Sequence, residues 1–370
     1  MELSFLAAMP GLLIWTAILL LPWRPWSTRE SLDSDPECQT DLSDVTVLIP
    51  ARNEALTIAD TLSALKRQGP GLKIILVDDK STDTTAQEAE SVKLDDLSIV
   101  KGSELAEGWS GKLWALEQGR KLVKSKYLIL LDADIVLAER LIPTILEKAK
   151  KENLQMLSLM AFLKMQTFWE KLLMPAFIFF FKLLYPFSLS NKSNSFVAAA
   201  AGGFIFIETE VLEQLGGFNC IKNALIDDCS LAKKVKQNGY NIWTGLSHSA
   251  ISIRSYDKLS TIWQMVARTA YTQLYYSPWL LILCTLLMFT AFGIPLLTLT
   301  QSQVIVFTVG IVTLCLQAIC YLPTLRYYSI QPMYVISLPF TGILYLIMTW
   351  SSAFQYYFGR GASWKGRNYN

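Results

Sequence analysis

Apolar residues are concentrated at the two ends of the chain and in one central block, whereas residues 40–165 have the mixed composition of a soluble α/β domain. The hydrophobic fraction, 52% of 370 residues, is above that of ordinary soluble domains. The mixed stretch is long enough to bury a core of its own. We therefore expect a soluble domain that is joined to membrane segments.

The first apolar run, residues 3–23, carries no charged residue and is long enough to cross a bilayer as a helix. It lacks the basic start and the small-residue cleavage site of a secretory signal, so we interpret residues 1–23 as an N-terminal transmembrane anchor. Arg24 and Arg29 follow it. Because basic residues favour the inner side of a membrane, the domain in residues 40–270 is expected in the cytosol.

Three further apolar runs predict a C-terminal transmembrane region in residues 278–358. They cover residues 279–300, 304–322 and 333–358. Three crossings would place the basic tail, residues 359–370, outside, against the positive-inside bias. One run is therefore expected to be re-entrant or interfacial, and the third, which contains Pro339 and Gly342, is favoured.

The central block, residues 168–187, contains three charged residues among many aromatic ones. It is either another span or an interfacial helix, and we favour the interfacial helix. A span would put the membrane between the acidic pair Asp132 and Asp134 and the second pair, Asp227 and Asp228. Both pairs are expected in one site.

The middle of the chain alternates between predicted strands and helices. Residues 45–50, 74–77, 127–131 and 204–207 are short aliphatic runs typical of buried strands. Helices are predicted after the first two, with Asn53 as a cap of the first helix and residues 81–83 at the start of the second. This order predicts an α/β fold with a mostly parallel sheet flanked by helices.

Asp132 and Asp134 directly follow the predicted strand 127–131. Two carboxylates at a strand end can both face one Mg²⁺ or Mn²⁺ ion, which prefers oxygen ligands and bridges to substrate phosphates. The alternative is a solvated acidic turn. Because open α/β sheets bind ligands at the carboxyl ends of their strands, we favour Asp134 and Asp132 as metal ligands beside a nucleotide diphosphate, with Asp132 also facing the donor.

Four more residues are expected to bind the nucleotide part of this substrate. Asp78, Asp79 and Glu54 would accept hydrogen bonds from the base or ribose, although Glu54 also fits the first turn of a helix. Lys112 follows a loop flanked by glycines and would pair with a donor phosphate. Its alternative is a solvated surface lysine.

Asp227 and Asp228 precede a helical pattern of apolar residues. A carboxylate here can remove the proton of an attacking acceptor hydroxyl. The alternative is a helix N-cap, which fits Asp227 better, so Asp228 is the favoured base with Asp227 beside it. Gln264 and Arg268 share one helix face and are expected to meet the diphosphate or acceptor, or alternatively lipid headgroups, at the membrane surface.

Several chemistries are excluded. The net charge is +2 without a dense basic block, which argues against nucleic acid as a partner. The six cysteines form no CxxC pair, and His248 is the single histidine, expected to be structural. Neither a P-loop nor a dinucleotide-binding glycine motif is present.

The ordered motifs resemble the family 2 inverting glycosyltransferases, which have a GT-A fold. They are Pro50-Ala-Arg-Asn-Glu54, Asp78-Asp-Lys-Ser-Thr-Asp83, Asp132-Ala-Asp134 and Asp227-Asp228. A closer resemblance, to the hopene-associated glycosyltransferases, rests on five stretches: Gly108-Trp-Ser-Gly-Lys-Leu-Trp114, Phe168-Trp-Glu-Lys-Leu-Leu-Met-Pro-Ala-Phe177, Ala224-Leu-Ile-Asp-Asp-Cys229, Met265-Val-Ala-Arg-Thr-Ala-Tyr-Thr-Gln273 and Trp364-Lys-Gly-Arg367. This resemblance implies a bacterial membrane enzyme linked to hopanoid metabolism.

The chain is more distantly similar to ceramide glucosyltransferases and cellulose synthases, which carry a Gln/Arg-x-x-Arg-Trp motif. Here Thr269 follows Arg268 in place of tryptophan, which argues against processive polymer synthesis. The resulting expectation is inverting sugar transfer from a nucleotide-diphosphate sugar to a lipid-like acceptor. Transfer to polyprenyl phosphate and a non-catalytic membrane scaffold are the alternatives.

Overall fold

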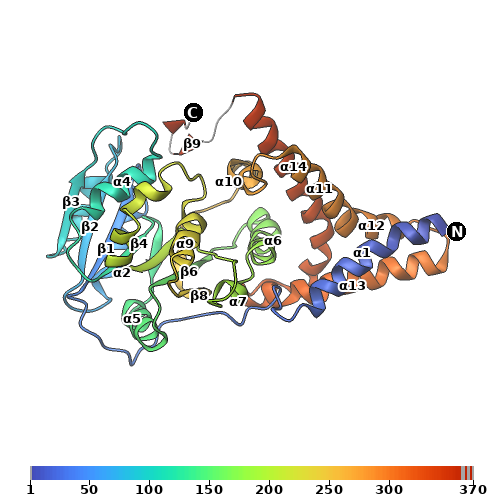
Figure 1. Cartoon of the computed structure of the whole chain (residues 1–370), viewed down its shortest axis with the longest axis horizontal. Helices are drawn as coiled ribbons and strands as arrows, with labels where there is room; N and C mark the ends of the chain where they lie inside the picture. The colour runs from blue at the N-terminus through green and yellow to red at the C-terminus, as the bar shows by residue number, and fades with distance from the viewer. Residues whose placement is uncertain (1, 360–362, 365–366, 369–370) are drawn as a thin grey trace.

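The computed structural model describes residues 2–359, 363–364 and 367–368, and the tail residues Arg360 and Lys365 lie outside this part. An eight-stranded sheet with the order β3-β2-β1-β4-β7-β6-β8-β5 forms the α/β domain (Figure 1). Its strands are β1 (Val45–Ala51), β2 (Lys73–Asp78), β3 (Leu97–Lys101), β4 (Tyr127–Leu131), β5 (Ile135–Leu137), β6 (Met156–Leu163), β7 (Phe204–Glu208) and β8 (Ile242–Ser252).

The four predicted strands are confirmed as β1, β2, β4 and β7. The prediction of a mostly parallel sheet is confirmed only in part, because the sheet is mixed, with four parallel and three antiparallel strand pairs. β1 pairs in parallel with both β2 and β4, whereas β7 is antiparallel to β4 and to β6. β5 is also antiparallel to its neighbour β8. The carboxyl ends of β1, β2 and β4 therefore lie at one edge of the sheet.

Helices cover both faces of the sheet, which explains why strands such as β1 and β4 are buried along their whole length. One core packs against α2 (Ile58–Lys66), α3 (Thr85–Ser91) and α5 (Leu141–Glu152). The core on the other face packs against α4 (Gly111–Arg120), α8 (Thr209–Gln214) and α9 (Asp227–Gln237).

Two predicted helix starts are wrong, because polar side chains there bond across loops instead, and the alternative N-cap role of Asp227 is not observed. Asn53 has a left-handed backbone (φ 53°) and accepts a hydrogen bond from the Thr82 amide at 2.8 Å, while the N-cap of α2 is Thr57. α3 begins at Thr85 rather than at residues 81–83. The N-cap of α9 is Ile226, so Asp227 is the first residue of that helix and not its cap.

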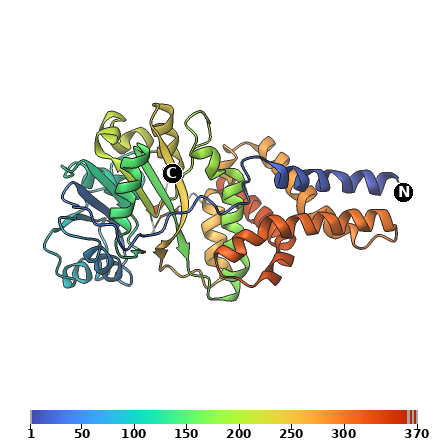
Figure 2. The ribbon, with the colours of Figure 1, turned by 90° about the horizontal axis from the view of Figure 1, so that it is seen from below.

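A group of apolar helices projects from the α/β domain in both ribbon views (Figures 1 and 2). It consists of α1 (Glu2–Leu20), α11 (Pro278–Met288), the π-helical turn η2 (Phe289–Gly293), α12 (Ile294–Thr298) and α13 (Val304–Tyr327). Trp15 connects α1 to η2, because its buried indole N–H donates a hydrogen bond to the Ala291 carbonyl at 3.0 Å.

Four helices in the described part are long and apolar enough to cross a membrane. They are Phe168–Ser190, Pro278–Thr298, Val304–Tyr327 and Pro332–Tyr357. The apolar part of α1, Ser4–Leu20, is shorter, so the expected N-terminal span has only partial support.

Three helices lie between the α/β domain and the projecting group, namely α6 (Phe168–Leu184), α10 (Leu259–Gln273) and α14 (Leu338–Tyr357). A capping box of Thr167 and Glu170 starts α6. The Tyr345 hydroxyl of α14 donates to the Leu173 carbonyl of α6 at 2.9 Å. The helical elements α7 (Phe187–Ser190), η1 (Gly217–Ile221) and η3 (Pro332–Ser337) and the hairpin β9 (Ser363–Trp364) and β10 (Arg367–Asn368) complete the described elements.

Both ends of α14 lie on the side of the α/β domain. α11 and α12 lead away from that domain and α13 returns to it, so η3, which follows α13, begins on the domain side (Figure 1). At the other end, the Tyr357 hydroxyl is 2.9 Å from the hydroxyl of Tyr271 in α10. Tyr356 stacks on Tyr276, which lies two residues before the start of α11. The chain therefore enters and leaves α14 on the same side, the side of the α/β domain.

Candidate functional site

A cavity of about 800 Å³ lies at the carboxyl edge of the sheet, between the α/β domain and helices α6 and α10. Eight of the ten predicted site residues line it. They are Glu54, Lys112, Asp132, Asp134, Asp227, Asp228, Gln264 and Arg268. The two acidic pairs, which are distant in sequence, therefore face one space.

Lys112 is the direct link between the two acidic pairs. The Ser110 side chain caps α4, and this cap places Lys112 in the first turn of the helix. Its ammonium group lies 2.7 Å from Asp132 and 3.9 Å from Asp227. Burial opposes the charged form, but Asp132 and Asp227 outweigh burial and raise the pKa of Lys112, so the side chain is a cation at neutral pH.

Asp134 is paired with a second cation, Arg254, which no sequence pattern pointed to. The Arg254 Nε donates to Asp134 Oδ2 at 2.5 Å, and its Nη2 donates to Glu54 Oε1 at 2.8 Å. Arg254 lies two residues beyond β8, a strand that was itself not predicted. Because β8 reaches β4 only through other strands of the sheet, local spacing could not reveal this contact.

Asp132 and Asp134 have the chemistry that a divalent cation needs. Both are carboxylates at the end of one strand, and burial, together with the charge of Asp134, raises the pKa of Asp132. A bound cation would relieve this repulsion. The described residues contain no group of three or more His, Cys, Asp or Glu side chains that could hold a metal alone. Two carboxylates nevertheless fit Mg²⁺ or Mn²⁺, which take their remaining ligands from water and substrate phosphates.

Asp228 occupies the first turn of α9, where its Oδ1 accepts a hydrogen bond from the Cys229 amide at 2.7 Å. Burial, reinforced by Asp227, raises the pKa of Asp228 to about 7. A Cβ atom on Gly202 would lie 3.3 Å from Asp228 Oδ2 and 3.4 Å from the Lys112 ammonium. The glycine thus allows the backbone to approach both groups closely.

The wall of the cavity formed by α6 and α10 is largely apolar. Its lining there includes Met174, Phe177 and Phe181 of α6 and Met265 of α10. Gln264 and Arg268 face the same space from α10, as their spacing predicted. The strand ends thus contribute carboxylates to the lining, α6 contributes methionine and aromatic side chains, and α10 contributes both polar and apolar ones.

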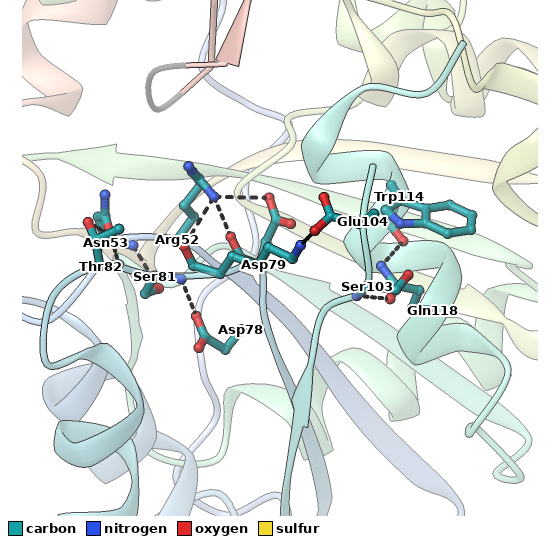
Figure 3. Close-up of polar contacts among 11 residues, drawn as sticks. Arg52, Asn53, Asp78, Asp79, Ser81, Thr82, Ser103, Glu104, Trp114 and Gln118 are labelled. Carbon is teal, nitrogen blue, oxygen red and sulfur yellow. Dashed lines mark hydrogen bonds and ion pairs between the residues drawn. The ribbon is translucent and has the colours of Figure 1, made fainter. Parts of the chain in front are cut away.

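Asp78 and Asp79 do not line the cavity. Asp78 accepts a hydrogen bond from the Ser81 amide at 3.0 Å, and the fully buried Asp79 lies 4.0 Å from the Arg52 guanidinium (Figure 3). Arg52 also donates to the Asp79 backbone carbonyl at 2.6 Å. Both aspartates thus support the loops after β1 and β2, and direct contact with a base or ribose remains a prediction.

His248 lies outside the cavity. Its ring nitrogens are 3.2 Å from Asp33 Oδ2 and 3.1 Å from the Tyr327 carbonyl oxygen, and its ring stacks on that of Tyr327. The side chain therefore connects β8 to the N-terminal linker and to the end of α13. This position agrees with a structural role.

Comparison with known proteins shows that the α/β domain is similar in sequence to family 2 glycosyltransferases. Residues 46–216 match the family model described as Glycosyl transferase family 2. A 4,4'-diaponeurosporenoate glycosyltransferase of Staphylococcus haemolyticus is 33% identical over 29% of this chain and 28% of its own. A poly-beta-1,6-N-acetyl-D-glucosamine synthase of Staphylococcus aureus is 38% identical over 29% of this chain and 26% of its own. The matches thus span little more than a quarter of each relative.

The fold is similar to that of a solved mannosyltransferase, PcManGT from Pyrobaculum calidifontis, in complex with GDP-Man and Mn²⁺. The TM-score is 0.59 at 17% identity, and the alignment covers 92% of this chain and 99% of the other. At this identity the similarity describes the fold alone. It extends beyond the matched domain to most of the chain.

Proposed function

We propose that the protein is a membrane-bound glycosyltransferase that transfers a sugar, with inversion, from a nucleotide-diphosphate sugar to a hydroxyl group of a lipid-like acceptor. The observation that carries this proposal is the position of Lys112, whose ammonium contacts Asp132 of one acidic pair and Asp227 of the other. Donor-binding and acceptor-activating groups therefore share one cavity, as a single-displacement reaction requires.

In the proposed reaction, the acceptor oxygen attacks the anomeric carbon of the sugar while the bond from that carbon to the diphosphate oxygen breaks. Asp228 takes the proton of the acceptor hydroxyl, and the nucleoside diphosphate leaves with the bonding electron pair. The raised pKa of Asp228 suits this step, because general bases work best with a pKa near the working pH. Attack from the face opposite the diphosphate inverts the anomeric centre.

The remaining cavity residues would bind the donor. Asp134 and Asp132 would hold Mg²⁺ or Mn²⁺, which supplies charge neutralisation for the leaving diphosphate. Lys112, Gln264 and Arg268 would contact phosphate oxygens as hydrogen-bond donors. Glu54 would accept hydrogen bonds from the nucleoside or sugar, and Asp78 and Asp79 would shape its binding loop.

The apolar wall of α6 and α10 supports a hydrophobic acceptor. Phe177 and Phe181 would contact its apolar body while its hydroxyl reaches Asp228. One relative is named for the acceptor 4,4'-diaponeurosporenoate, and the motif resemblance adds a link to hopanoid metabolism. In the polyprenyl phosphate alternative, the acceptor is already a nucleophile and Asp228 has no proton to remove.

The arrangement of α14 supports a multi-pass membrane protein whose α/β domain is cytosolic, and the motif resemblance implies that the membrane is bacterial. If α1, α11–α12 and α13 cross the bilayer, while α6 and α14 lie at its inner surface, then Arg24, Arg29, Arg326 and the basic tail all lie inside. This three-span arrangement removes the charge conflict that three C-terminal crossings would create.

This topology predicts the labelling of single cysteines, introduced at Ser302 and Ser363 in a background without the native cysteines. A membrane-impermeant maleimide added to intact cells should label Ser302→Cys, which lies between α12 and α13. Ser363→Cys should react only after permeabilisation, because α14 returns to the inner side. Labelling of Ser363→Cys in intact cells would show that α14 crosses the membrane.

The pKa of Asp228 predicts the pH dependence of transfer. Only the carboxylate form accepts a proton, so the transfer rate should fall about tenfold per pH unit below pH 7 and level off above it. Asp227→Asn removes a charge that raises this pKa, so the acid limb should move to lower pH. Steady-state kcat measured from about pH 5 to 9 checks both statements. A flat profile in the native protein would rule out Asp228 as the titrating base.

Donor turnover by the purified full chain in lipid nanodiscs tests the proposed function. UDP- and GDP-sugars are supplied with Mn²⁺ and a bacterial lipid extract, and release of nucleoside diphosphate is measured. At least one donor should be consumed, and Lys112→Met should reduce its turnover. No turnover of any donor would favour a non-catalytic scaffold.

A further inference from the structure

Arg254 is a cavity residue that the proposed reaction does not use. Its guanidinium bridges Asp134, which follows β4, and Glu54, which follows β1. It therefore neutralises carboxylates at the donor end of the cavity, one of which is a proposed metal ligand. The question is what becomes of this ion pair when a donor and its metal bind.

The geometry indicates which partner can move. The Asp134 carbonyl accepts a hydrogen bond from the Ile253 amide at 2.9 Å, and β5, which begins at the next residue, pairs with β8. The Asp134 side chain is only 7% exposed, whereas the Arg254 side chain is 37% exposed. The backbone of Asp134 is held by the sheet, whereas the longer arginine side chain lies on the cavity wall and is the more exposed of the two.

A divalent cation and Arg254 compete for the same carboxylate. Asp134 Oδ2 already accepts a hydrogen bond from Arg254 Nε at 2.5 Å, so a metal ion bound to that oxygen would lie next to the guanidinium. The metal ion and the guanidinium are both cations, and neighbouring cations repel one another strongly in a partly buried site. The diphosphate of a donor offers the displaced guanidinium a new partner, because the planar arginine fork binds phosphate oxygens in pairs.

We propose that Arg254 is an exchangeable counter-ion, an inference that rests on the proposed function. Without donor it pairs with Asp134 and Glu54. When the donor and its metal bind, it releases Asp134 to the metal and binds the diphosphate. Arg254 is thus a donor-binding residue that also weakens metal binding in the absence of donor, so metal and donor bind together rather than metal alone.

The test measures the affinity of the full chain in nanodiscs for Mn²⁺. Electron paramagnetic resonance detects the bound ion, with and without UDP or GDP. Without nucleotide, Arg254→Gln should bind Mn²⁺ about 5- to 150-fold more tightly than the native protein, the usual range for coupling between two sites. With nucleotide present this advantage should shrink or reverse, because the diphosphate loses a partner. In turnover assays, the KM for the donor should rise more than kcat falls.

Two variants control this experiment. Arg254→Lys keeps the positive charge without the planar fork. Its Mn²⁺ affinity should lie between those of the native protein and Arg254→Gln. Arg67→Gln removes an exposed arginine whose ion pair with Glu139 lies outside the cavity, and it should bind Mn²⁺ like the native protein.

The outcomes separate the two proposals. If the native protein binds Mn²⁺ and nucleotide but Arg254→Gln binds Mn²⁺ equally or less tightly without nucleotide, the exchange is wrong while the proposed function stands. If the native protein binds nucleotide without any Mn²⁺ dependence, Arg254 is a permanent substitute for the metal and the exchange is also wrong. If it binds neither nucleotide nor Mn²⁺, both proposals fail.

Discussion

Asp228→Asn is expected to lower kcat for sugar transfer by roughly 10²- to 10⁴-fold, the usual contribution of a general base. The amide is nearly isosteric with the carboxylate but cannot take the proton of the acceptor hydroxyl. The KM for the donor should change little, because Asp228 belongs to the acceptor-activating pair. Initial rates with a labelled donor and saturating acceptor measure both quantities.

The matched control is Glu152→Gln, which makes the same chemical change in an exposed ion pair with Lys148. It should leave kcat unaltered. Asp228→Glu keeps a base in the cavity and should recover part of the activity. If Asp228→Asn retains native activity, the acceptor is already a nucleophile, and the polyprenyl phosphate alternative replaces transfer to a hydroxyl.

Asp134→Asn is expected to lower kcat/KM for the donor by at least about 100-fold, more than is typical for residues that only support a metal ligand. The substitution removes one of two carboxylates proposed to hold the metal, and it leaves Arg254 without its closer partner. Higher Mn²⁺ concentrations should restore part of the activity. Initial rates across a Mn²⁺ titration, compared with Glu152→Gln, provide the measurement. An unchanged Mn²⁺ dependence in Asp134→Asn would show that the metal binds elsewhere or is not used.

The sequence predicted those parts of the site that follow local rules. Aliphatic runs identified β1, β2, β4 and β7, and the rule that ligands bind at the carboxyl ends of strands predicted the edge of the sheet where Asp132 and Asp134 line the cavity. The helical spacing of Gln264 and Arg268 likewise placed both on the cavity side of α10. These features depend on residues that are close together in the chain.

The missed features depend on distant contacts. Arg254 meets Asp134 and Glu54 only because β8 joins the sheet beyond β6, which no local pattern encodes. The mixed direction of the sheet follows from β7, whose partners are also remote in sequence. Asn53 has the composition of a helix cap, yet its side chain bonds to Thr82 across a loop, so a tertiary contact overrides the local preference.

The acceptor group determines the chemistry of this site. The linkage between sugar and lipid in the product identifies that group most directly. The purified chain in nanodiscs is incubated with an isotope-labelled donor and the lipids of its host, and labelled lipids are identified by mass spectrometry before and after mild acid treatment. A glycoside of a lipid alcohol, inverted at the anomeric carbon and resistant to mild acid, is the predicted product. An acid-labile glycosyl phosphate, or free labelled sugar without any lipid product, would contradict transfer to a lipid hydroxyl through Asp228.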